Sequence, residues 1–107
     1  MEKFVEFSLH EYMDMYPTQH VRTMKGENLE DIEKNSKEYA KLMTKQYSGG
    51  PTSFVKVMNK EEARQWIDKN IAEIGNNPDD IDKDWIKTVE GIFHSCYDLN
   101  NNQSINS

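Results

Sequence analysis

The side chains with the clearest capacity for chemistry are the acidic groups between residues 79 and 84. Four aspartates fall within these six positions: Asp79, Asp80, Asp82 and Asp84. Asp80 and Asp84 would be i,i+4 neighbours on a helix, where like charges repel, so folding alone does not favour the pair. One interpretation is an acidic surface that meets a basic partner. The alternative is that the carboxylates only complement a helix dipole and keep the protein in solution.

A second candidate surface is aromatic. Tyr12 and Tyr16 bracket a segment that also holds Met13 and Met15. A short helix over residues 8–16 is too small to bury all four side chains, and exposed patches of this kind often mark partner sites. A strand that buries these residues is the competing interpretation.

Oxygen-bearing side chains recur at alternate positions near the C-terminus. They are Asp98, Asn100, Asn102 and Ser104. After an amphipathic helix, this spacing resembles ligand positions 1, 3, 5 and 7 of an EF-hand calcium loop. The stretch departs from that loop at Gln103, where glycine makes the turn, and no glutamate follows at the twelfth position. A polar tail over residues 100–107, which we expect to be mobile, is the simpler interpretation.

Other sites for metals or nucleophilic catalysis find little support. The three histidines and Cys96 lack the spacing of a zinc site, and Cys96 lies on an apolar helix stripe, where a thiol behaves as a small hydrophobe. His94 and Cys96 are two positions apart, so they point away from each other on a helix. We therefore expect no cofactor, no metal and no enzymatic activity.

Composition restricts the class of protein. The chain has 107 residues and a formal net charge of −6, which predicts one domain over residues 1–99 and disfavours direct binding to nucleic acid. No apolar run is long enough for a membrane span, and the first residues lack the features of a signal peptide. The single cysteine fits a reducing cytoplasm, where we expect the protein to reside.

The charge is unevenly distributed along the chain. Residues 1–58 hold nine acidic and eight basic side chains, whereas residues 59–107 hold ten and five. Nearly all of the acidic excess therefore belongs to the C-terminal part, which we expect to be helical.

The N-terminal segment alternates in polarity and predicts a strand over residues 3–7, with Val5 and Phe7 on one face. Ser8 then fits a helix N-cap, and the helix it opens would end before Pro17. This pattern predicts a short helix directly after the strand.

A strand over residues 19–24 precedes the strongest helix signal in the sequence, over residues 29–46. Asn28 is a good N-cap, and acidic residues follow it at the positive end of the dipole. The predicted apolar stripe consists of Leu29, Ile32, Ser36, Tyr39, Leu42 and Met43.

Residues 53–58 are apolar on both faces of a strand, which predicts a central or well-covered strand. Asn59 and Glu62 then form a capping box for the next helix. The predicted buried stripe of that helix is Ala63, Trp66, Ile67, Ile71 and Ile74.

The last helix is predicted to begin at Asn77 and Pro78. Its apolar stripe consists of Ile81, Trp85, Val89, Ile92, Phe93 and Cys96. Gly91 inside this helix costs up to about 1 kcal/mol relative to alanine, which a close approach of a neighbouring element would explain.

Together these elements predict an α+β fold, with a sheet of about three strands covered by three to four helices in a single pair of layers. We expect a non-enzymatic, cytoplasmic module that binds a basic or nucleic-acid-processing protein. Small acidic chains of this composition are typical of immunity proteins, antitoxins and phage-encoded inhibitors. Mimicry of nucleic acid by the carboxylates is a more specific form of this hypothesis, and it ranks second. The alternatives are a calcium-binding domain and a structural subunit of an oligomer.

Overall fold

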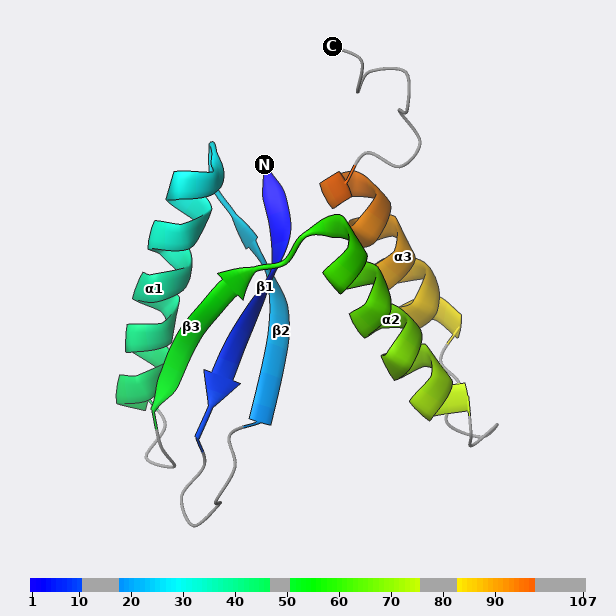
Figure 1. Ribbon diagram of the computed structural model, residues 1–107, viewed down its shortest axis with the longest axis horizontal. Helices are drawn as coiled ribbons and strands as arrows, with labels where there is room; N and C mark the ends of the chain where they lie inside the picture. Colours follow the sequence, from blue (N-terminus) through cyan, green and yellow to red (C-terminus); the bar gives the residue numbers. More distant parts are fainter. Residues whose placement is uncertain (11–17, 47–50, 76–82, 98–107) are drawn as a thin grey trace. The chain divides into compact units, whose positions relative to one another are not determined.

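The computed structural model describes residues 1–10, 18–46, 51–75 and 83–97 (Figure 1). Within them the chain has the predicted α+β fold, with a three-stranded antiparallel sheet and three helices. Internal contacts divide the chain into two compact units, Met1–Met58 and Asn59–Ser107. None of the helices in the described part of the chain is long and apolar enough to span a membrane. The predicted tail over residues 100–107 lies outside the described residues.

The first unit is a sheet with one helical crossover. Its elements are β1 (Glu2–Leu9), β2 (Thr18–Lys25), α1 (Leu29–Gln46) and β3 (Thr52–Val57), and the strand order is β2-β1-β3. Because β1 is antiparallel to both neighbours, β2 and β3 run parallel to each other. Parallel strands need a long crossover connection, and α1 supplies it (Figure 1).

The central strand is β1, which confirms the strand predicted over residues 3–7 and extends it. The predicted helix cap at Ser8 is wrong, because Ser8 lies in β1 opposite Gln19 of β2 and Ser53 of β3. Strand pairing on both sides holds Ser8 within the sheet, and this tertiary pairing overrides the local capping signal. Residues 11–17, the remainder of that predicted helix, lie outside the described residues.

The strand β3 lies at the edge of the sheet, so of the two predicted alternatives, a central or a well-covered strand, the central position is wrong. The pairing changes register between Glu6 and Phe7, which face Lys56 and Phe54, and Val55 is the extra residue of a bulge. Val55 is 44% exposed. The apolar residues on both faces of β3 therefore reflect this bulge and the packing of α1 against one face. They do not reflect a paired strand on each side of β3.

The core of the first unit lies between α1 and one face of the sheet. Val5 and Phe7 share that face as predicted, and they pack with Ile32 and Ala40 of α1. The rings of Tyr39 and Phe54 lie against Phe7, with centroid separations of 5.1 and 6.4 Å. The fully buried Ser36 is satisfied within its own helix, since its hydroxyl donates to the carbonyl of Ile32 at 2.6 Å.

The boundaries and N-cap of α1 are confirmed. The side chain of Asn28 accepts a hydrogen bond from the backbone of Asp31 at 2.9 Å. The predicted apolar stripe is wrong at two positions, because Leu29 and Leu42 are 55% and 52% exposed. A helix that covers a three-stranded sheet buries a narrower stripe than residue spacing alone suggests.

The second unit is a pair of helices, α2 (Lys60–Gly75) and α3 (Lys83–Tyr97). The predicted capping box opens α2: Asn59 Oδ1 accepts from the Glu62 backbone at 2.8 Å, and Glu62 Oε1 accepts from the Asn59 backbone at 3.1 Å. The buried apolar side chains are Ala63, Ile67, Val89, Phe93 and Cys96. The two tryptophans, Trp66 and Trp85, are partly buried.

Two predictions concern α3: where the helix begins, and why it contains Gly91. The described helix begins at Lys83, while its predicted cap and first residue, Asn77 and Pro78, lie outside the described residues. The close approach predicted at Gly91 is wrong, because a Cβ atom at this position would meet no described atom within 4 Å. Gly91 is exposed, so no packing requirement explains it.

Candidate functional site

Of the four aspartates predicted to bind a partner, the structure describes one. Asp84 lies in the first turn of α3, where its side chain is exposed and its charge complements the helix dipole. Its backbone carbonyl accepts a hydrogen bond from the Thr88 hydroxyl at 2.8 Å. Asp79, Asp80 and Asp82 lie outside the described residues.

The other predicted sites lie entirely outside the described residues. These are the aromatic pair Tyr12 and Tyr16 and the calcium-loop positions Asp98, Asn100, Asn102 and Ser104.

The helices α2 and α3 carry little net charge themselves. Their described residues hold six acidic and five basic side chains. The acidic excess of the second unit therefore falls almost entirely on Asp79, Asp80, Asp82 and Asp98.

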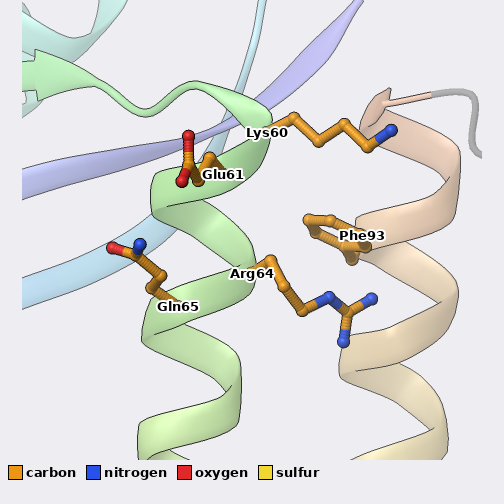
Figure 2. Close-up of a pocket in the computed structure, with 5 residues that line it drawn as sticks. All are labelled: Lys60, Glu61, Arg64, Gln65 and Phe93. Carbon is orange, nitrogen blue, oxygen red and sulfur yellow. The ribbon is translucent and has the colours of Figure 1, made fainter.

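A groove of about 490 Å³ on the second unit is lined by Lys60, Glu61, Arg64, Gln65 and Phe93. Figure 2 shows Lys60 and Arg64 extending from α2 toward α3, with the Phe93 ring between them. The Arg64 guanidinium lies over this ring, 4.1 Å from its centroid, an arrangement that favours both stacking and cation–π attraction.

Arg64 also joins α2 to α3 through a bidentate ion pair with Glu90. The two nitrogen–oxygen distances are 2.5 and 3.1 Å, and Asp68 lies 3.6 Å from the same guanidinium. The hydrogen bonds from Arg64 lower the pKa of Glu90 below its usual 4.5. The same bonds raise the pKa of Arg64 above its usual value. Both groups therefore remain charged at neutral pH, so the ion pair links the two helices under these conditions.

His94 extends this network. Its Nε2 lies 3.7 Å from Glu90 Oε2, and its Nδ1 is buried with no hydrogen-bond partner among the described residues. Cys96, on the same helix, is only 5% exposed, as predicted for a core thiol. In the described part of the chain, no three histidine, cysteine, aspartate or glutamate side chains form a group that could hold a metal ion.

The most distinctive surface of the first unit is a positively charged groove that sequence reasoning did not identify. It has a volume of about 550 Å³ and lies between α1 and β3. We call it the lysine groove and define it by its lining residues: Lys37, Ala40, Lys41, Thr44, Lys45, Thr52, Ser53 and Phe54. No acidic side chain is among them.

The three lysines follow one another at i,i+4 spacing along α1. Lys37 pairs with Glu33 at 2.9 Å and lies 5.8 Å from the centroid of the Phe54 ring. Lys41 and Lys45 are exposed and have no acidic partner within 4 Å in the described residues. Positive charge therefore accumulates at this groove, although the whole chain is acidic.

Thr44 fixes the width of the lysine groove at one end. Its hydroxyl oxygen accepts a hydrogen bond from the backbone N–H of Thr52 at 2.9 Å. The same oxygen is within hydrogen-bonding distance of the carbonyl oxygens of Ala40, at 2.8 Å, and Thr52, at 3.1 Å. This threonine therefore attaches α1 to the first residue of β3.

The lysine spacing is visible in the sequence, because Lys37, Lys41 and Lys45 recur at every fourth residue of the helix predicted over residues 29–46. The groove could not be predicted from the sequence, because it requires β3 to lie at the sheet edge beside α1. Local sequence patterns do not determine strand order.

Comparison with known proteins gives no relative for this chain: no protein-family model, curated protein or solved structure matches it.

Proposed function

We propose that this chain is a non-enzymatic protein-binding module of the inhibitor or immunity type that acts in the cytoplasm on a basic or nucleic-acid-processing protein. The residues that we propose for partner binding are Asp79, Asp80, Asp82 and Asp84 of the second unit and, as a separate candidate surface, Tyr12 and Tyr16 of the first unit. Carboxylates would attract and orient the basic partner, and the tyrosines would supply apolar contact.

The observation that supports this proposal is the position of the acidic excess. The charges on α2 and α3 nearly balance, and the Arg64 charge is matched by Glu90 and Asp68. In the sequence, three of the four aspartates that make up the surplus come directly before α3, in whose first turn Asp84 is exposed and has no ion pair among the described residues. Concentrated charge of one sign raises the association rate with an oppositely charged protein.

Neutralising part of this cluster tests the proposal. Partners captured by the wild-type chain from a cytosolic extract would be identified by mass spectrometry, and the association rate of each would then be measured with the purified chain. The double variant Asp82→Asn, Asp84→Asn should slow association by roughly tenfold at low salt and by much less at 0.5 M salt, because salt screens exposed charges. The double variant Glu38→Gln, Glu73→Gln is the matched control, since it removes two exposed carboxylates elsewhere.

An association rate that is equal for the two double variants would contradict the proposed surface. A captured partner without a basic patch would contradict the proposed partner class. Competition between the partner's nucleic-acid substrate and this chain would support the mimicry form of the proposal.

A further inference from the structure

The lysine groove carries an inference that is independent of the acidic surface proposed above. It combines three features of the first unit: lysines without an acidic side chain among the lining residues, the position of β3 at the edge of the described sheet, and the partly buried ring of Phe54. Each restricts the class of partner that fits.

The open edge belongs to β3. It is the last strand in the order β2-β1-β3, and an antiparallel strand points alternate backbone groups away from its paired neighbour. At Thr52 these outward groups contact the Thr44 hydroxyl. Beyond Thr52, Ser53 and Phe54 also line the groove, and the strand continues from there to Val57. Such an edge is a template for an additional strand.

The charge spacing matches an extended chain. Lysines four residues apart on a helix are separated by about 6 Å along its axis. Alternate side chains of an extended segment lie about 6.8 Å apart on one face. Figure 1 shows α1 running alongside β3. The lysines of α1 and the side chains of a segment paired with β3 would therefore repeat along the same direction. Carboxylates at alternate positions of an added strand would therefore meet Lys37, Lys41 and Lys45 in succession.

The aromatic residue that lines the groove is Phe54, and its ring packs against other side chains. Phe54 is partly buried, with its ring against Phe7 at 6.4 Å and the Lys37 ammonium 5.8 Å from its centroid. A ring held in this way offers an apolar contact but little free face for stacking by nucleic-acid bases, which bind exposed aromatic platforms.

We propose that the lysine groove binds an extended acidic segment of a partner protein, which pairs with the edge of β3 and places alternate carboxylates against Lys41 and Lys45. Backbone hydrogen bonds to β3 supply the alignment, and the lysines select acidic sequences.

The direct test uses a ten-residue peptide in which glutamate and valine alternate, titrated against the intact chain. We expect a dissociation constant below about 1 mM at low salt, with amide chemical-shift changes concentrated at residues 41–45 and 53–57. The same peptide with N-methylated backbone amides at alternate positions should bind at least tenfold more weakly, because it cannot pair with the strand. Equal binding of the two peptides would overturn strand addition.

Lysine variants test the charge contribution. The double variant Lys41→Gln, Lys45→Gln should weaken peptide binding about tenfold. The matched control, Lys69→Gln with Lys87→Gln, removes two exposed helical lysines of the second unit and should change binding less than twofold. Equal losses in the two double variants would overturn the assignment to this groove, since only overall charge would then matter.

Two further outcomes would identify another occupant and overturn the proposal. Tighter binding of a thymidine hexanucleotide than of the peptide would indicate nucleic acid. Concentration-dependent self-association that Lys41→Gln, Lys45→Gln abolishes would indicate a second copy of this chain, bound through its own acidic residues. Chemical-shift mapping on the wild-type chain gives a result even if a variant fails to fold.

Discussion

At the scale of single residues, the ion pair between Arg64 and Glu90 is an interaction whose strength depends on pH. The pair joins α2 to α3, and the side chains are only 33% and 29% exposed, so it is worth more than a solvated surface pair. Its pKa shift has the sign of a stabilising contact, because Arg64 favours the ionised form of Glu90 in the folded chain.

We therefore predict that Glu90→Gln lowers the free energy of unfolding by about 1 kcal/mol at pH 7. The pKa of Glu90 is lower in the folded chain than its usual 4.5, so the wild-type advantage is complete above that value. It should disappear as the pH falls through the folded pKa, where the carboxylate becomes protonated in both states. Urea denaturation at pH 7 and at successively lower pH measures this difference.

The matched control for this prediction is Glu73→Gln, which removes an exposed carboxylate from α2. Its effect on stability should be small at every pH. A Glu90→Gln effect that persists unchanged at pH 3 would show that packing of the side chain, rather than the ion pair, stabilises the two helices.

At the scale of elements, local signals predicted what local interactions determine. The capping atoms of Asn28, Asn59 and Glu62 form the predicted hydrogen bonds, and the helix boundaries follow from them. The same kind of signal failed at Ser8, because pairing with two strands from distant parts of the chain decides the conformation there. Sequence patterns report on neighbours a few residues away, whereas sheet order depends on residues dozens of positions apart.

The candidate sites follow the same division. The concentration of aspartates at residues 79–84 is a property of composition and was visible in the sequence. The lysine groove depends on β3 lying at the sheet edge. The apolar sequence of β3 instead favoured a central or well-covered strand. Burial of β3 residues by α1 imitates the pattern of a strand with neighbours on both sides.

Thr44 provides a test of how α1 is attached to β3. We predict that Thr44→Val, which preserves shape but removes the hydroxyl, lowers the free energy of unfolding by about 1–2 kcal/mol, since the Thr52 N–H loses its acceptor. Hydrogen exchange at the Thr52 amide should accelerate in the same variant. The measurement combines urea denaturation with amide exchange followed by NMR.

Thr88→Val is the control for the Thr44 variant, because the Thr88 hydroxyl bonds only to the Asp84 carbonyl of its own helix among the described residues. Its cost should be well below 1 kcal/mol. Equal effects of the two substitutions would mean that the contact between Thr44 and Thr52 adds nothing to stability.

At the scale of the whole molecule, the question is whether the two compact units unfold together. The length of the chain predicts one domain, and a pair of helices of the size of α2 and α3 buries too little surface to be stable alone. Both tryptophans, Trp66 and Trp85, belong to the second unit, so their fluorescence reports on that unit, whereas far-UV circular dichroism reports on both.

We predict that thermal unfolding followed by tryptophan fluorescence and by circular dichroism gives coincident curves with a single midpoint, as expected for one cooperative domain. Lys69→Gln serves as the control, since an exposed surface change should leave the curves coincident. Separate midpoints, with fluorescence changing first, would show that the units are independent domains.

The order of the strands also has a consequence for synthesis. The central strand, β1, precedes both of its neighbours in the chain, and its second partner is complete only at Val57. At about 5–20 residues per second, a ribosome takes roughly 2–10 s to pass from Leu9 to Val57. Hairpin pairing needs only microseconds once β2 has emerged, so from then until β3 is complete the nascent chain carries β1 with one of its two backbone edges unpaired. Its yield in a cell should therefore depend on how well that edge is shielded before β3 emerges.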